Sequence, residues 1–458
     1  MPAMKQLGIT TQECEHATTI SCILDDSINY IVANRAAYVV NPDKDFIRNR
    51  MLPMDTIMKI MITSNGGSIQ ENIQKMFDKE EKNGLIPIIP TIPAFVKQRD
   101  KIKPNAYYDL FIRATKAWEK ASMLDHYKGF RVMAIDGTDI NIYPHPEDET
   151  FIKVKDKAGY SQYHATMMCD VLNSTYHDIV VQKKHLANEI DAAKEMIQRD
   201  ETEKCIYVMD RYYFSYDLAA TIIEKSAFYV IRAKGGEKTA LFAKDLPSGE
   251  CDVEVPFEIV TSKKGGLKKD QIFQRTPSKK AGAKNSYKAT WSHGNHFKMT
   301  IRVVRFTLKT GEYETIYTNL PRDGFSVEAI KDLYNSRWGI ETSFRNLKYP
   351  VGAAVQHSKK LDAALSEIYA KVISYNLIAF TMLGVSVKQE QRTKYHYAPS
   401  FKMACYCCIC FFRSKRRDAL CLLYNIKHNR EAVRPGREDK RKIIPKRFIP
   451  FPYRILAA

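Results

Sequence analysis

A polar helix between residues 326 and 350 limits the possible folds and functions of this chain more than any other stretch. Ser326 precedes apolar and acidic residues, a pattern that starts helices, and Pro350 ends the segment because proline has no amide hydrogen to donate. At about 100° per residue, one sector of roughly 60° on this helix carries four polar side chains. These are Tyr334, Arg337, Glu341 and Lys348.

Two interpretations of this face are open from the residues alone. An Arg–Glu pair four residues apart can simply stabilise a solvent-exposed helix. A single carboxylate beside a phenol and two cations is also suited to a site that binds a metal ion and phosphates. The second interpretation accounts for all four side chains, whereas the first accounts only for Arg337 and Glu341.

The residue types and their spacing, Tyr334-x2-Arg337-x3-Glu341-x6-Lys348, resemble the YREK signature of the DDE transposases of bacterial insertion sequences. The match is complete in type and spacing. The resemblance implies two aspartates upstream, each at the end of a strand, that act together with Glu341.

Two short apolar runs upstream end in aspartate: residues 131–135 precede Asp136, and residues 205–209 precede Asp210. Hydrophobic patterns between 131 and 231 predict three strands, a helix, a strand, a helix and a strand. That order is typical of an RNase H-like fold, whose metal ions lie at such acidic strand ends. The predicted fold class is therefore α/β with an RNase H-like catalytic core.

Each aspartate also has an ordinary structural interpretation. Asp136-Gly137 favours a tight hairpin turn, and we expect one here between two strands. Asp210 could cap a strand end beside Arg211. In the resembled family the Asp-Gly-Thr pattern selects Asp136 rather than Asp139. The same family usually has glycine at the position of Tyr212, so a different local loop is expected here.

The candidate catalytic set is Asp136, Asp210 and Glu341. Three gathered carboxylates repel one another, and divalent cations relieve that repulsion. Mg²⁺ takes oxygen ligands, and two ions about 4 Å apart can activate an attacking oxygen and stabilise the leaving one. We therefore predict that the three carboxylates bind two Mg²⁺ ions, for which Mn²⁺ can substitute. The resemblance implies cleavage of transposon ends followed by joining of the 3′-hydroxyl ends to target DNA.

Four further residues are candidates for DNA contacts. Tyr334, Arg337 and Lys348 are hypothesised to bind phosphates near the cleaved end. In the resembled family a tryptophan in a β-rich insertion can stack on a flipped base, and Trp291 is the tryptophan of the insertion here. Packing of Trp291 in a small β core is an equal alternative. Trp338 lies off the polar face and is expected to pack.

The chain divides into five predicted regions. The first is a helical N-terminal region that we predict to bind DNA through a helix-turn-helix-like unit, although a helical bundle without DNA contact would show the same pattern. A β-rich insertion interrupts the core, and a helical region with a basic tail ends the chain. The boundaries are 1–126 (N-terminal), 127–233 (core), 234–320 (insertion), 321–350 (signature helix of the core) and 351–458 (C-terminal).

Charge predicts a polyanionic partner. Lysine and arginine number 71 against 52 aspartates and glutamates, a net charge of +19. Residues 263–288 hold nine basic residues and one acid, and the tail from Phe411 holds 14 basic and 4 acidic residues. Such segments suit a phosphate backbone, so double-stranded DNA is the predicted partner. A basic surface that binds nothing specific is the alternative.

The sequence also predicts where the protein acts. No secretory signal follows Met1, and the most apolar helical stretch, residues 368–385, is interrupted by Lys371 and Asn376. We expect a cytoplasmic protein with no membrane contact, associated with the bacterial nucleoid. The resembled family implies a homodimer on two DNA ends.

Two competing functions are open. One is an RNase H-like nuclease that cuts DNA without joining it. The other is an inactive or domesticated transposase that acts as a sequence-specific DNA-binding protein. The presence of all three carboxylates argues against an inactive site, because an inactive site would be free to lose them.

Overall fold

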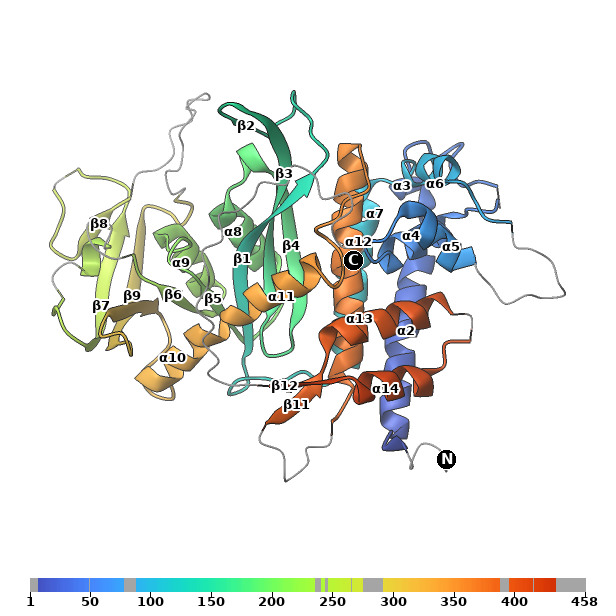
Figure 1. Ribbon diagram of the computed structural model, residues 1–458. Coiled ribbons are helices and arrows are strands. Elements are labelled where there is room, and N and C mark those ends of the chain that lie inside the picture. Colours follow the sequence, from blue (N-terminus) through green and yellow to red (C-terminus); the bar gives the residue numbers. More distant parts are fainter. Residues whose placement is uncertain are drawn as a thin grey trace.

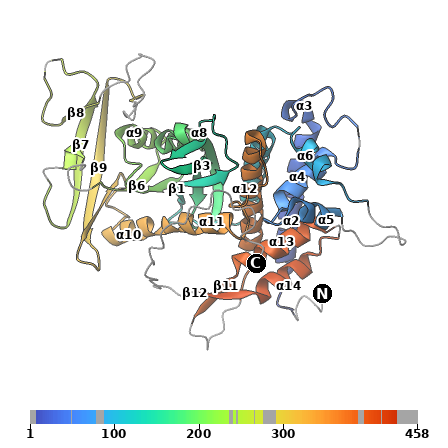
Figure 2. The same ribbon diagram turned by 45° about the horizontal axis from the view of Figure 1, so that its top comes forward.

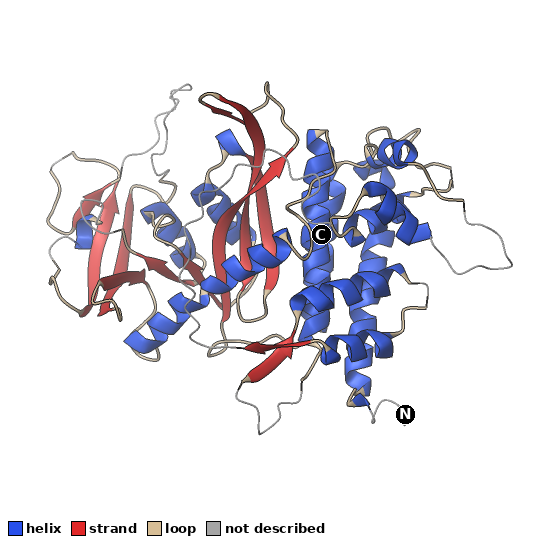
Figure 3. Cartoon of the chain, in the orientation of Figure 1, coloured by secondary structure: helices blue, strands red, loops and turns tan. Residues whose placement is uncertain are grey.

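The computed structural model shows an α/β body on one side and a helical body on the other, with helix α12, Leu361–Leu383, between them (Figure 1). Most of the strands lie in the α/β body, whereas helices predominate in the other body (Figure 3). The structure describes residues 7–48, 50–77, 88–234, 240–243, 246–264, 266–274, 291–387, 395–414 and 416–433. Much of the basic segment 263–288 and the tail from residue 434 onward lie outside the described residues.

A ten-stranded mixed sheet forms the α/β body, in the order β2-β3-β1-β5-β6-β10-β9-β7-β8, with β4 paired to β3. The central strand β1 is antiparallel to β3 and parallel to β5, and β5 is parallel to β6. The strands are β1 Arg131–Ile142, β2 Phe151–Val154, β3 Lys157–Asp170, β4 Thr175–Lys183, β5 Cys205–Met209, β6 Phe228–Arg232, β7 Cys251–Val260, β8 Gln271–Phe273, β9 His296–Thr307 and β10 Tyr313–Thr318.

Strands from the predicted insertion extend this sheet. β10 pairs antiparallel with β6, and β9 and β7 follow in turn, so these three strands continue the same hydrogen-bonded surface. Two short 3₁₀ helices, Lys184–Leu186 and Leu241–Ala243, lie in the connections.

Alternating side chains of the central strands pack helices on both faces of the sheet. Tyr207 and Met209 of β5 join a core cluster with helices α8, Glu189–Arg199, and α9, Tyr216–Glu224. Their neighbours Ile206 and Val208 join a cluster on the opposite face. There they meet α10, which is followed by α11, so the two helix pairs lie on opposite sides of the sheet (Figure 2). The bounds are Val327–Ser336 for α10 and Trp338–Lys348 for α11.

The helical body is built around α12. Asn376 lies on this helix and binds both backbone groups of Tyr176 in β4 through its side chain, which fixes the helix against the sheet. Lys371 is fully buried and donates to Ser64. The other elements of this body are α2 Thr11–Ala33, α3 Arg35–Tyr38, α4 Met54–Thr63, α5 Ile69–Phe77, α6 Ile92–Arg99, α7 Pro104–Ala121, α13 Phe401–Arg413, α14 Ala419–His428, and the hairpin of β11 His396–Pro399 and β12 Arg430–Val433.

The two interruptions of the apolar stretch are thus buried polar anchors inside a core helix. Within the described ranges, none of the helices is both long and apolar enough to cross a membrane.

Helix α6 lies in the region predicted to bind DNA, but two basic side chains at and just after its end are paired inside the protein. Arg99 is buried and pairs with Asp100, and Lys101 pairs with Asp45. Binding of DNA by this region stays a prediction.

Candidate active site

Asp136 lies in the middle of β1 and faces helix α11. Ala134 and Val132, two and four residues earlier on the same face, pack against the helices on that side, and the two-residue period places Asp136 next in line. The expected hairpin turn at Asp136-Gly137 is therefore wrong, because β1 runs unbroken from Arg131 to Ile142.

The carboxylate of Asp136 is poorly compensated. Its Oδ1 accepts a 2.9 Å hydrogen bond from the Gly137 amide, and its Oδ2 lies 3.6 Å from the Arg337 Nη1 atom. Burial raises the pKa of Asp136 to about 6, and the repulsion from Asp210 and Glu189 adds to this effect. The Gly137 amide and the Arg337 charge offset it only in part.

Asp210 lies beside Asp136 because of the strand register. β1 and β5 pair in parallel from Arg131–Cys205 to Ile135–Met209, so the next residues of the two strands are the two aspartates. The Oδ1 atom of Asp210 accepts a 2.6 Å hydrogen bond from the Tyr212 amide, which turns the chain away from the strand.

Arg337 joins the strand side of the site to the helix side. The signature helix, expected to be continuous, is divided at Arg337 into α10 and α11. There the hydrogen bonds from Arg337 to Tyr334 and from Ile340 to Arg337 span three residues instead of four, which tightens the turn. The Arg337 Nη2 atom lies 3.2 Å from Glu341 Oε1, so this guanidinium lies between Glu341 and Asp136.

The two aromatic neighbours of Arg337 differ in exposure. The guanidinium lies 5.8 Å from the ring centre of Tyr334, which is buried in the core beside the sheet. It lies 4.9 Å from the ring centre of Trp338, which is 50% exposed. The expectation that Trp338 packs is therefore wrong. Arg337 itself is only 6% exposed, and no described residue accepts a hydrogen bond from its Nε.

The remaining predicted DNA contacts lie apart from this group. Lys348 is the last residue of α11, about two turns beyond Glu341. Trp291 is 6% exposed, packs against His293 and Phe297, and donates a 2.6 Å hydrogen bond to the Gly294 carbonyl. These surroundings favour the packing alternative, and base stacking by Trp291 stays a prediction.

The site fits divalent cations by its chemistry. Carboxylate oxygens are the ligands that Mg²⁺ takes, and Asp136 carries the raised pKa of a buried acid near other acids. Arg337 is the cation that lies between two of the carboxylates. In the described part of the chain, no three acidic, histidine or cysteine side chains are yet grouped closely enough to hold one ion.

Sequence reasoning missed two residues that adjoin Asp136. Glu189 begins α8, and its charge acts on Asp136. Tyr213 donates to Glu189 and lies in the loop after Asp210. The sequence contained one signal, the tyrosine at 212 where the resembled family has glycine, which marked this loop as different.

Comparison with known proteins shows similarity to transposases. A family model described as a transposase DDE domain matches residues 127–377, more than half of the chain. The transposase InsG for insertion sequence element IS4 of Escherichia coli K12 is 20% identical over 300 residues, which are 64% of this chain and 61% of that protein. The chain thus spans about three fifths of the length of this relative.

Two other similarities cover less or are more distant. The transposase for insertion sequence element IS421 of Escherichia coli is 32% identical over 72 residues, 16% of this chain and 19% of that protein. A solved structure, a piggyBac transposase synaptic complex with hairpin DNA, aligns with a TM-score of 0.40 at 13% identity over 84% of this chain and 76% of that one.

Proposed function

Because the chain belongs to the family of transposases with a DDE domain, we propose that it cuts DNA at the ends of a mobile element and joins the 3′-hydroxyl ends to target DNA. The observation that carries this proposal is the register of β1 and β5. It brings Asp136 and Asp210 side by side, on the face where Arg337 and Glu341 approach.

We assign Asp136, Asp210 and Glu341 as the catalytic residues and as ligands of two Mg²⁺ ions, with Mn²⁺ as a substitute. Such ions supply positive charge at the attacking and leaving oxygens of an in-line displacement. The three side chains come from three separate elements, β1, the end of β5 and α11. The order β3-β1-β5-β6 of the central strands supports an RNase H-like core.

Arg337 is assigned to a DNA phosphate near the cleaved end. Its guanidinium already lies between two carboxylates, and its planar fork can bind phosphate oxygens in a bidentate manner. Tyr334 supports the guanidinium from the core side, where burial raises the pKa of the phenol and keeps it neutral. Lys348, farther along α11, is assigned to the backbone of the same DNA strand.

The regions of the chain have distinct proposed tasks. Residues 127–233 and 321–350 supply the catalytic core, and the described strands β7 to β10 of the region 234–320 extend its sheet over the DNA. The helical region 351–458 binds double-stranded DNA through its surplus of basic residues. The helical region 1–126, in which basic and acidic residues are nearly balanced, binds DNA through its helix-turn-helix-like unit. As in the family, two copies of the chain pair on two DNA ends. A protein with this activity works at the bacterial nucleoid.

The test uses linear DNA that contains the sequences flanking the coding region, with purified protein and Mg²⁺. The unaltered protein is expected to cleave at defined ends and to insert pre-cut ends into a supercoiled plasmid. Glu341→Gln is expected to bind the same DNA and neither cleave nor insert. Cleavage by that variant would overturn the site, and cleavage without insertion by the unaltered protein would indicate a nuclease.

A further inference from the structure

Gly137, directly after Asp136, has no room for a side chain. A Cβ atom at this position would lie 2.5 Å from the Nε2 atom of His164 and 2.8 Å from the Cδ atom of Glu189. The φ angle of Gly137 is not positive, so its backbone is not in the left-handed conformation that favours glycine. The glycine is therefore required by two side chains that press against the strand, and no turn requires it.

His164 is held firmly in that place. It lies on β3 directly opposite Asp139 of β1, and its Nδ1 atom is 2.6 Å from Asp139 Oδ1. Lys184 also donates to Asp139 at 2.7 Å. The Nε2 atom of His164 lies 3.1 Å from Glu189 Oε1, an ion-pair distance without hydrogen-bond geometry. The ring is thus fixed between a residue of β1 and the first residue of α8.

Glu189 continues the contact toward the other aspartate. Its Oε2 atom accepts a 2.8 Å hydrogen bond from the hydroxyl of Tyr213, which is fully buried. The Tyr213 amide in turn donates to the backbone carbonyl of Asp210 at 3.2 Å. A continuous series of polar contacts therefore runs from the loop after β5, through α8 and β3, to β1.

This series begins where backbone pairing ends. The described ladder between β1 and β5 ends at Ile135–Met209, one residue before the two aspartates. Beyond that point, the polar contacts of Tyr213, Glu189 and His164 link the two chain segments.

We propose that Tyr213, Glu189 and His164 are positioning residues that set the separation of Asp136 and Asp210, and thereby the affinity of this pair for a divalent cation. The proposal rests on the proposed function, because it takes these aspartates as metal ligands. Groups that orient metal ligands typically change metal affinity by about 10- to 100-fold when they are removed.

The test measures Mn²⁺ binding to the full-length protein without DNA, from the loss of the electron paramagnetic resonance signal of free Mn²⁺. Tyr213→Phe removes only the hydroxyl, and we expect it to raise the Kd for Mn²⁺ about ten-fold or more. The matched control is Tyr207→Phe. Tyr207 is equally buried and donates at 2.7 Å to Asp200. This variant should keep the Kd of the unaltered protein even if it unfolds at a lower temperature.

The outcomes separate this proposal from the proposed function. If Asp136→Asn leaves Mn²⁺ binding unchanged, the assignment of the metal ligands fails. If Asp136→Asn weakens binding and Tyr213→Phe does not, the positioning role is overturned. Equal weakening by Tyr213→Phe and Tyr207→Phe would also overturn it. Gly137→Ala, which must displace His164 or Glu189, provides a second variant and should weaken binding in the same direction.

Discussion

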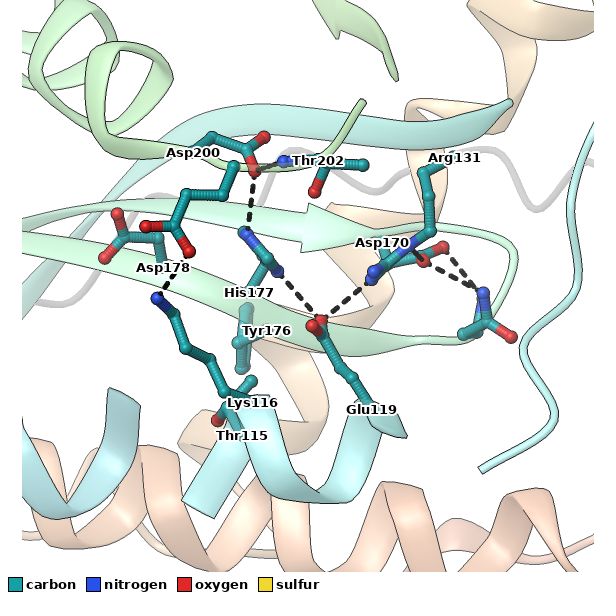
Figure 4. A network of polar contacts seen from close by, with 12 residues as sticks. Thr115, Lys116, Glu119, Arg131, Asp170, Tyr176, His177, Asp178, Asp200 and Thr202 are labelled. Carbon is teal, nitrogen blue, oxygen red and sulfur yellow. Dashed lines mark hydrogen bonds and ion pairs between the residues drawn. The ribbon is translucent and has the colours of Figure 1, made fainter. Parts of the chain in front are cut away.

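Strand β1 carries two groups of charged residues, and they are built in opposite ways. At its first residue, Arg131 donates to Asp170 at 2.6 Å and to Glu119 at 2.9 Å, and His177 lies between Glu119 and Asp200 (Figure 4). Five residues later, Asp136 has Arg337 as its nearest cation, at 3.6 Å. The first group is closely paired, whereas the second has an excess of carboxylates.

The difference shows in the acidity of two buried carboxyl groups. Although burial raises the pKa of Glu119, His177 and Arg131 lower it to about 2. Burial raises the pKa of Asp136 to about 6, and the Gly137 amide and the Arg337 charge offset this rise only in part. The same strand therefore contains one group whose charges are paired within the fold and another with excess negative charge, where we propose that the metal ions bind.

The largest expected effect concerns the group around Asp136, which has an excess of carboxylates. Asp136→Asn should lower the rate of DNA cleavage by more than about 10,000-fold, because it removes a proposed metal ligand. It should not lower the unfolding temperature, because it removes a buried charge that is poorly paired. Asp323→Asn, a change on an exposed loop, is the control for both measurements. A large loss of stability in Asp136→Asn would abolish the contrast between the two groups.

The next effect concerns the paired group. Glu119→Ala should reduce the free energy of unfolding by about 3–5 kcal/mol, because it leaves Arg131 and His177 buried without this partner. Urea denaturation gives this value. Glu201→Ala breaks the ion pair with Lys116 at 2.9 Å, whose glutamate is 81% exposed, and should change stability little. Similar denaturation midpoints for the two variants would mean that burial of the group contributes nothing.

The pH dependence of stability provides a second test of the paired group. Burial lowers the pKa of His177, but its hydrogen bonds to Asp200 and Glu119 raise it to about 10. A histidine whose pKa is raised on folding contributes full stability below its unfolded pKa, about 6.5, and loses it as the pH rises toward 10. The stability difference between the unaltered protein and His177→Gln should therefore be largest near pH 6 and shrink toward pH 10. A constant difference over this range would refute the charged state of His177.

A smaller effect is expected from Arg337→Lys, which keeps the positive charge beside Asp136 and removes the planar guanidinium. A lysine has no planar fork to bridge Asp136 and Glu341, and it loses the guanidinium contact 4.9 Å from the Trp338 ring centre. Insertion of pre-cut ends should fall about 100-fold, as when one preorganised donor is lost. Arg345→Lys, an exposed change on the same helix, is the control. Full activity of Arg337→Lys would show that charge alone is sufficient.

The sequence predicted the parts of this site that depend on local pattern. Five apolar residues before Asp210 predicted β5, and the start signal at Ser326 with the stop at Pro350 predicted the helical segment that carries Glu341. A large mixed sheet with helices on both faces agrees with the predicted α/β class. These features follow from periodicity, which one stretch of sequence contains in full.

The sequence failed where distant residues decide the structure. Asp136-Gly137 has the composition of a turn, but the glycine is required by His164 from β3 and Glu189 from α8. The signature helix is likewise divided at Arg337, a residue that contacts a carboxylate of β1 as well as one of α11. No local pattern contains such contacts, so the supporting residues Glu189 and Tyr213 were not predicted.

The smallest expected effect is spectroscopic and uses a tryptophan beside each group. Trp118, which precedes Glu119, is fully buried, and Trp338, which follows Arg337, is 50% exposed. Two variants each keep a single tryptophan, Trp118 or Trp338, and have phenylalanine at the other two tryptophan positions. DNA containing the element ends should quench the emission of Trp338 and leave the emission of Trp118 unchanged. The physical reason is that the exposed Trp338 ring, beside the arginine proposed to bind phosphate, is available for stacking on a base, a contact of about 1–3 kcal/mol. Quenching of Trp118 instead would place DNA at the Arg131 end of β1, beside the paired group, and reverse the roles assigned to the two groups.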